Sequence, residues 1–258
     1  MLLLLFAAAL LFFAWSSRRD AAAQGQYLKS LGMRLISGGC YDMGDPSKNP
    51  LKGGLPLHRV CLDPFYLKND LVTVGEFGAF VRESGYRTES ERSGGCHVLA
   101  GLSTEMERSA TWRHPGYPQT DSNPVVCVSW RDAGRFIDWI VRKSPKQGMA
   151  FRLPTEGEWE FAARNRGERV AGDFPPRASL LFHRPEDQGE WLADWFVEAD
   201  RARPETNPSG PGSGKYKVFR GAARADEKGS GLYARYRREP DYRSNDLGFR
   251  LALSMTDR

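Results

Sequence analysis

The sequence predicts a single α+β domain with short strands, a few helices and extensive irregular loops. The chain combines 27 Gly and 16 Pro with 7 Trp, which is typical of ordered loops held by large side chains rather than of long amphipathic helices. Its 258 residues are enough for a substantial core, in one large domain or two small ones. Because no stretch has the composition of a linker between domains, we expect one domain.

The N-terminal segment has the composition of an export signal. Leu2 to Trp15 is an apolar run of 14 residues, shorter than the ~20 residues of a membrane-spanning helix and typical of a signal peptide. Ala21-Ala22-Ala23 offers a cleavage site. Two features differ from a typical signal peptide: no Lys or Arg precedes the run, and Arg18-Arg19 follow it. An uncleaved anchor, or a translation start upstream of Met1, is therefore an open alternative.

These features set the expected boundaries and location. We expect a signal peptide or short anchor at residues 1–23, a linker at 24–31 and the domain at 32–255. The protein should be exported to the periplasm or the outside of the cell, with membrane association through the N-terminus as an alternative to release.

The four cysteines agree with export. They are Cys40, Cys61, Cys96 and Cys127, an even number that predicts two disulfides in an oxidising compartment. Three pairings are open. We favour the sequential ones, Cys40 with Cys61 and Cys96 with Cys127, because each pair flanks one loop. A zinc site would require C-x-x-C spacing, which is absent.

Strand and helix signals alternate in the first half of the chain. Residues 33–36 and 60–67 are apolar and predict strands, the first of them stopped by Gly38-Gly39. Thr73, with Glu76 three residues later, has the pattern of a capping box, so a helix should begin there.

A long ordered loop and two more helices are expected next. Residues 88–124 are rich in Ser, Thr and Pro and should be irregular, whereas residues 124–128 are a strand-like apolar run. Helices should begin at the capping pairs Ser129–Asp132 and Thr155–Glu158.

The last third should alternate short strands with loops. Residues 191–197 are aromatic, and residues 203–214 hold three Pro and three Gly and must be loop. Strands are expected at residues 217–221 and 247–253.

The net charge of +5 is concentrated near the C-terminus. Lys215 to Arg250 holds 10 Lys and Arg against 5 Asp and Glu, so this stretch accounts for the whole excess. It is either a solvated basic face or a surface for an acidic partner. A nucleic-acid binder would show a basic stripe or a known module, and we expect no nucleic-acid binding.

A series of blocks in a fixed order resembles a known family. The most distinctive is Arg152 to Arg164, with the sequence RLPTEGEWEFAAR. The others are Gly38-Gly39, Met43-Gly44, Pro56 with His58, Thr111 to Pro115, Asn123 to Ala133, Gly189 to Trp195, Val218 to Ala222 and Gly248-Phe249-Arg250.

Together these blocks identify the chain as a member of the formylglycine-generating (sulfatase-modifying factor) family over residues 32–254. The resemblance implies a C-type-lectin-like α+β fold with a small twisted antiparallel sheet, two helices and much irregular loop.

The residues of these blocks also have a structural interpretation. Five tryptophans should bury large apolar area: Trp112, Trp130, Trp159, Trp191 and Trp195. Arg152, Glu156 and Glu160 should tie loops together through hydrogen bonds to backbone groups. These blocks therefore define the scaffold, which does not by itself fix function.

The activity that names the family requires residues that this chain lacks. Formylglycine-generating members resemble one another in two cysteines between the Val-x-Arg-Gly-Gly turn and the final Gly-Phe-Arg, and these thiolates bind copper(I). The corresponding window, Gly221 to Leu247, contains no Cys. The oxidase activity and its copper should not be carried over.

Other cofactors have little support in the sequence. The four histidines, His58, His97, His114 and His183, are scattered and predict no iron site. Asp173, Glu186 and Asp187 could supply oxygen ligands to calcium, but their spacing shows no cage. We expect no cofactor, with calcium left open.

The first functional hypothesis is a non-catalytic binding or assembly protein with a protein partner in the cell envelope. Its binding face would lie in the C-terminal window, where Arg and Tyr, typical of interface hot spots, are frequent. An enzyme with a changed active site and a lectin-fold ligand-recognition protein are the alternatives. The predicted binding residues are Arg224, Asp226, Tyr233, Arg235, Tyr236, Arg238, Asp241 and Tyr242.

Overall fold

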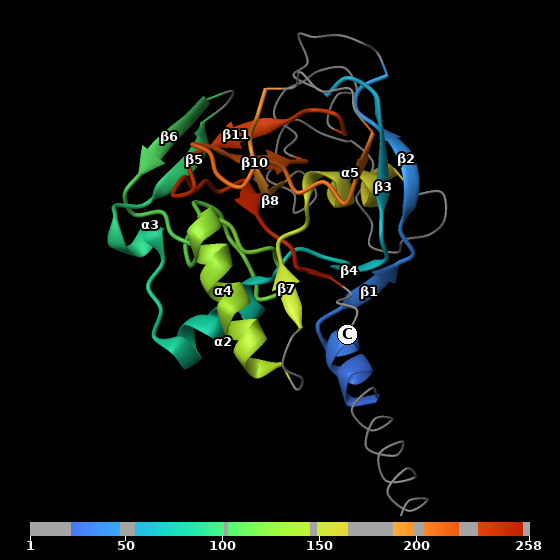
Figure 1. The fold of residues 1–258 in the computed structure, drawn as a ribbon. Helices are drawn as coiled ribbons and strands as arrows, with labels where there is room; N and C mark the ends of the chain where they lie inside the picture. Colours follow the sequence, from blue (N-terminus) through green and yellow to red (C-terminus); the bar gives the residue numbers. More distant parts are fainter. Residues whose placement is uncertain are drawn as a thin grey trace, which may run out of the picture.

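Four small β-sheets and a few helices carry the fold (Figure 1). The computed structural model describes residues 22–46, 55–100, 103–144, 149–164, 188–198, 204–221 and 232–254. The predicted α+β class is confirmed. The architecture is richer than expected, because the described strands form four sheets instead of one and the helices number more than two.

The first sheet joins the two ends of the domain. Its order is β1 (Met33–Ile36), β4 (Phe65–Lys68), β13 (Ala252–Ser254) and β7 (Ala150–Arg152), and all neighbours are antiparallel. The first and the last strand of the domain therefore both pair with β4, which closes the fold.

The second sheet holds the C-terminal window. Its order is β11 (Tyr236–Arg238), β10 (Lys217–Arg220), β8 (Gly189–Trp195) and β12 (Leu247–Gly248), with β12 parallel to β8. The strand expected over residues 247–253 is broken between β12 and β13. Arg250 lies in the break, where its guanidinium forms a buried ion pair with Glu190.

Two smaller sheets flank these. Strands β2 (Gly39–Met43), β3 (His58–Leu62) and β9 (Glu205–Thr206) form one, and the hairpin of β5 (Cys96–Ala100) and β6 (Ser103–Glu107) forms the other. The hairpin corrects the irregular structure expected for residues 88–124, which also contain the short helix α3 (Glu89–Arg92).

The main helices begin where the sequence predicts. Capping boxes are present at Thr73 for α2 (Val74–Ser84) and at Ser129 for α4 (Trp130–Lys143). Thr155 and Glu158 exchange the same pair of hydrogen bonds at the start of α5 (Glu156–Arg164). In each case the side chain of the N-cap residue satisfies a backbone N–H group that has no partner within the helix.

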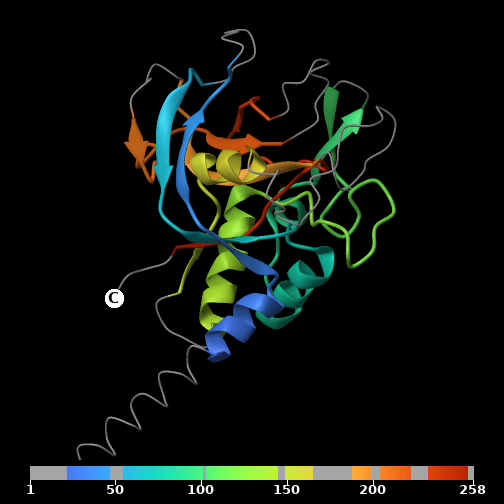
Figure 2. The same cartoon turned by 90° about the vertical axis from the view of Figure 1, so that its right-hand side faces the viewer.

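Residues 24–31, expected to be a linker, are mostly helical. A helix covers residues 22–30, Leu28 is buried, and the Tyr27 ring packs edge-on against Phe151 at 6.3 Å. The two large side chains anchor this segment to the core, which is why it is ordered. Figure 2 shows this helix beneath the lower end of α4.

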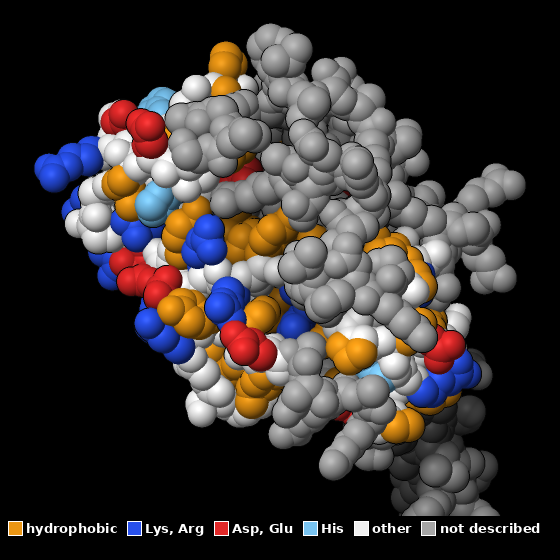
Figure 3. Space-filling view, turned by 90° about the horizontal axis from the view of Figure 1, so that it is seen from above, with side chains coloured by type: hydrophobic (Ala, Val, Ile, Leu, Met, Phe, Trp, Pro, Cys, Tyr) orange, Lys and Arg blue, Asp and Glu red, His pale blue; other side chains and the backbone are white. Residues whose placement is uncertain are grey.

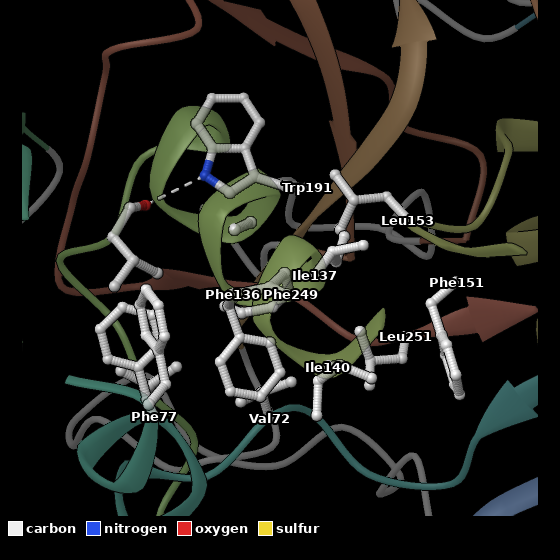
Figure 4. Close-up of a cluster of buried hydrophobic side chains, with 14 of the residues drawn as sticks. Val72, Phe77, Phe136, Ile137, Ile140, Phe151, Leu153, Trp191, Phe249 and Leu251 are labelled. Atoms are coloured by element: carbon white, nitrogen blue, oxygen red, sulfur yellow. Dashed lines mark hydrogen bonds between the residues drawn. The ribbon is translucent and has the colours of Figure 1, made fainter. Parts of the chain in front are cut away.

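Aromatic rings fill the space between α2, α4 and the sheets (Figure 4). Phe77 stacks on Phe136 at 5.9 Å, and the Trp191 indole donates a 3.1 Å hydrogen bond to the carbonyl of Val128. Three of the five predicted tryptophans, Trp112, Trp159 and Trp191, are buried, whereas Trp130 and Trp195 are half-buried.

The apolar run at residues 124–128 is buried but does not form a strand. Val125 N–H donates to Val72 and Cys127 N–H donates to Ser244, so successive residues have different partners. Cys127 also has a φ of 56°, which interrupts an extended chain.

Both predicted disulfides are confirmed, Cys40–Cys61 and Cys96–Cys127. They indicate an oxidising, extracytoplasmic compartment. Within the described part of the chain, no helix is both long and apolar enough to cross a membrane. The apolar run Leu2 to Trp15 lies outside that part.

Candidate functional site

The predicted binding residues do not form one cluster. Arg224 and Asp226 lie outside the described residues. The other six, which follow β10 and surround β11, are divided between a buried ionic network and a surface near the β5–β6 hairpin. These are Tyr233, Arg235, Tyr236, Arg238, Asp241 and Tyr242.

Arg235 belongs to a buried ionic network with α5. Its guanidinium donates to both oxygens of Glu156, at 2.6 and 2.8 Å. Arg220, with no exposed side-chain surface, bridges Glu156 at 2.6 Å and Glu160 at 2.8 Å. The two glutamates therefore bind arginine side chains. Glu160 also accepts a 2.8 Å hydrogen bond from the backbone N–H of Gly44, which confirms for this residue the expected hydrogen bond to loop backbone.

Arg152 is also paired with a glutamate of α5: its guanidinium makes two 2.6 Å hydrogen bonds to Glu158. Although burial acts to raise the pKa of Glu156, Arg235 and Arg220 lower it below its usual value. Glu156 is thus stabilised as an anion by its two arginine partners.

Asp194 and Lys217 form a second buried pair of titratable groups next to this network. Asp194 accepts a 2.8 Å hydrogen bond from the backbone N–H of Glu156 and so caps α5. Burial, and then the nearby charge of Glu156, raise the pKa of Asp194 to about 7. Burial lowers the pKa of Lys217 to about 8, against the attraction of Asp194.

The Lys217 ammonium lies between two indole rings. Its Nζ is 4.1 Å from the ring centre of Trp130 and 3.9 Å from that of Trp195, and it donates a 2.6 Å hydrogen bond to the carbonyl of Ala193. Cation–π contact therefore replaces part of the water that this lysine loses on burial.

Three predicted residues lie in aromatic stacks near the surface. Tyr236 stacks on Phe219 with ring centres 5.1 Å apart. Tyr242 stacks on His97 at 4.8 Å, and the Arg238 guanidinium lies 5.1 Å from the Tyr242 ring centre. Arg238, Tyr242 and His97, together called the His97 stack below, thus join the C-terminal window to the β5–β6 hairpin.

Two of the predicted residues remain. Tyr233 is half-buried, with the guanidinium of Arg164 5.1 Å from its ring centre. Asp241 is exposed, and its backbone carbonyl accepts a hydrogen bond from Arg243.

An open hollow of about 520 Å³ lies close to the His97 stack and was not predicted. Six residues line it: Glu107, Ser109, Ala110, His114, Gly116 and Tyr117. Seen from above in Figure 3, histidine side chains on this end lie among hydrophobic and charged groups.

Asn245 connects the hollow to the His97 stack. Its backbone N–H donates to His97, its side-chain amide donates to Pro115, and its backbone carbonyl accepts from the Tyr117 hydroxyl at 3.0 Å. Burial, and then the nearby Asp246, raise the pKa of Tyr117 to about 12, so the hydroxyl stays a donor. The lining residues all fall within residues 107–117. Sequence reasoning missed the hollow because contacts with Asn245, far along the chain, set the shape of this loop.

No group of three or more His, Cys, Asp or Glu side chains suited to a metal ion is present in the described ranges. Asp173, Glu186 and Asp187, considered as calcium ligands, and His183 lie outside those ranges. The calcium question is therefore still a prediction from sequence.

Comparison with known proteins decides the family. The profile described as "Sulfatase-modifying factor enzyme 1-like domain" matches residues 19–180. The chain belongs to the sulfatase-modifying factor family. The resemblance inferred from the sequence blocks is thereby confirmed.

Relatives of this sulfatase-modifying factor family member include proteins named as active enzymes and proteins named as inactive ones. The formylglycine-generating enzyme of Streptomyces coelicolor is 31% identical, over 86% of this chain and 88% of the relative. The inactive C-alpha-formylglycine-generating enzyme 2 of Bos taurus is 30% identical, over 87% of this chain and 88% of the relative. Family membership alone therefore does not decide whether this chain has the activity.

A solved structure agrees on the fold. PvdO from Pseudomonas aeruginosa matches with a TM-score of 0.65 at 21% identity, over 86% of this chain and 94% of PvdO. At that identity the match establishes a shared family fold.

Proposed function

We propose that this chain is a non-catalytic binding or assembly protein of the cell envelope. Its partner is a protein segment held at the hollow and the His97 stack. The observation that carries the proposal is the distribution of cysteine. All four cysteines lie at or before Cys127, and all four are disulfide-bonded. Gly221 to Leu247 therefore offers no thiolate to a copper ion.

The burial and ion pairing of the charged side chains near this window support the same proposal. Arg235 and Glu156 satisfy each other inside the protein, and Arg220 is fully enclosed by its partners. Groups that are this deeply buried and paired fix the scaffold and cannot reach a substrate.

The hollow supports binding rather than reaction. Its walls combine an imidazole, a phenol and a carboxylate with small residues, and the His97 stack adds an Arg–Tyr pair of the kind found at interface hot spots. Met106, 48% exposed on β6, adds an apolar contact beside it. A protein segment with one anchoring side chain would fit such a surface.

Site-specific photo-crosslinking in the native cell tests the proposal. A photoreactive phenylalanine analogue replaces Met106 near the hollow or, as a matched control, Val141, which is 41% exposed on α4 away from it. We expect one discrete protein adduct from position 106 and none from 141. The combined His114→Ala and Tyr117→Ala changes should remove the adduct, because both side chains line the hollow.

Two results would overturn the proposal. One is equal crosslinking from both positions, or an adduct indifferent to His114 and Tyr117. The other is stoichiometric copper in the purified protein together with oxidation of a cysteine-containing sulfatase peptide in the presence of oxygen, which would show that the chain is an enzyme despite its missing cysteine pair.

A further inference from the structure

A small notch lies between α2 and α4, away from the hollow. It has a volume of about 120 Å³ and is lined by Phe80, Ser84, Tyr86, Arg135, Asp138 and Arg142. That is room for several waters or for the oxygens of one phosphate group. The proposed function does not use this notch.

The charges of the notch favour an anion. Arg142 has no ion-pair partner among the described residues. Within the part of the chain that the structure describes, Arg135 pairs with Asp138 alone, at 3.6 Å, and both side chains are more than half exposed, so that pair is weak. The carboxylate of Asp138 repels an anion, but the two guanidinium groups leave the notch with a net positive charge. A planar guanidinium can also donate two parallel hydrogen bonds to phosphate oxygens.

The surroundings of the notch resemble those of a lipid–water boundary. Trp139 is half-buried next to Phe80, with ring centres 5.8 Å apart, and its indole donates to Glu83. Lys143 and the 41% exposed Val141 end the same helix. Tryptophan, lysine and apolar side chains together are typical of membrane interfaces.

The helix at residues 22–30 lies at this end of the molecule, and the apolar run precedes it in the chain. The helix at residues 22–30 rests on the last turn of α4, where the Tyr27 hydroxyl donates to the carbonyl of Ile140 at 3.3 Å (Figures 1 and 2). Six residues, 16–21, separate that helix from Leu2 to Trp15. A chain of that length spans at most roughly 20 Å, and it contains Arg18-Arg19.

From this geometry we propose that the notch between α2 and α4 binds the phosphodiester headgroup of an anionic phospholipid. The apolar N-terminal run holds this end of the protein at a bilayer, and Arg135 and Arg142 engage the lipid phosphate. Glu107 of the hollow ends strand β6, and the β5–β6 hairpin lies at the other end of α4 (Figure 1). The hollow therefore faces away from the membrane, toward its partner. The proposal rests on the envelope location in the proposed function.

Lipid photo-crosslinking of the full chain tests the site. The chain is reconstituted into phosphatidylcholine vesicles with and without phosphatidylglycerol, each carrying a trace of a photoreactive phosphatidylglycerol. We expect crosslinks in the peptides that contain residues 80–86 and 135–142. Arg142→Glu should lower them at least about fivefold, because it replaces attraction by repulsion at the lipid surface. Arg108→Glu, an exposed site on the hairpin side, is the matched control and should leave them unchanged.

The outcomes separate this proposal from its rivals. Crosslinks spread over the surface, or equal effects of Arg142→Glu and Arg108→Glu, would overturn it. Loss of the crosslinks on addition of inorganic phosphate would show a site for free phosphate instead and would also overturn it. Thermal unfolding of both variants shows that they are folded. Since no protein partner is present, failure here leaves the proposed function untouched.

Discussion

Arg220 has no contact with solvent, and both of its carboxylate partners lie on α5. Taking three charges out of water is unfavourable, and it is tolerated only because each charge has a close partner. Glu156 also binds Arg235, and Glu160 also binds Arg164. The network thus links β10, α5 and the chain before β11 through side chains alone.

Replacing Arg220 by methionine should destabilise the protein by about 3 kcal/mol, because two buried carboxylates would each lose one cation. The loss is at the lower end of the range for a broken buried pair, since each carboxylate keeps a second arginine. Urea unfolding of Arg220→Met against the unmodified protein measures it.

Arg59→Met is the matched control for that experiment. Arg59 pairs with Asp42 at 3.4 Å, with both side chains more than half exposed, so its removal should change stability by less than about 1 kcal/mol. Equal losses from the two variants would show that burial does not determine the contribution of the Arg220 network.

Helix α5 shows which parts of an element are encoded locally. Thr155 and Glu158 lie three residues apart in the chain, and their capping box was predicted from that spacing. Asp194 caps the same helix from β8, 38 residues further along the chain. No local pattern could reveal that contact, because it depends on how β8 packs against α5.

Because of Asp194, the free energy of unfolding should decrease as the pH rises from 4 to 7. Its pKa is about 7 in the folded state against 3.8 for an ordinary aspartate, so the folded state binds this proton more tightly. Its contribution is complete below pH 3.8 and is lost as the pH rises toward 7, at up to about 1.4 kcal/mol per pH unit. Asp194→Asn keeps the acceptor for Glu156 but cannot titrate, so its unfolding free energy should fall less over this range.

Lys217→Met is the contrasting variant in the same unfolding series. The pKa of Lys217 is about 8 against 10.5 for an ordinary lysine, so its contribution increases from pH 8 to pH 10.5. Lys217→Met should remove the increase in unfolding free energy between pH 8 and pH 10.5 and keep the decrease between pH 4 and pH 7. If Asp194→Asn and the unmodified protein show the same slope between pH 4 and pH 7, Asp194 is not the titrating group.

The sequence predicted most elements and only part of the candidate site, for a common physical reason. Helix starts, strand runs and sequential disulfides depend on residues close together in the chain. The role of Arg235 depends on α5, 79 residues away. Residues 107–117 line the hollow, but this loop is held by hydrogen bonds to Asn245, far along the chain. Arg235 was predicted to contribute to a binding face, and the structure shows that its guanidinium pairs with the buried carboxylate of Glu156, a contact that the local sequence does not reveal.

At the scale of the whole molecule, the two disulfides differ in burial and in the elements that they join. Cys40 and Cys61 are direct partners across β2 and β3, in a hairpin that backbone hydrogen bonds already hold. Cys96 and Cys127 are both fully buried and join β5 to the segment before α4. Cys127 N–H also donates to Ser244, so this disulfide fixes the hairpin next to the proposed binding face.

Removal of the two disulfides should therefore have unequal effects. The chain-entropy model gives about 3 kcal/mol or slightly more for either loop, but only Cys96→Ala with Cys127→Ala also leaves a buried cavity. That double variant should unfold at a lower temperature than Cys40→Ala with Cys61→Ala. It should also lose hydrogen-exchange protection over residues 96–107, whereas the other variant keeps it, because β5 is then held mainly by its pairing with β6 and Ser244. A larger loss from the Cys40–Cys61 pair, or full protection of the hairpin without Cys96–Cys127, would show that the binding face is held by its hydrogen bonds alone.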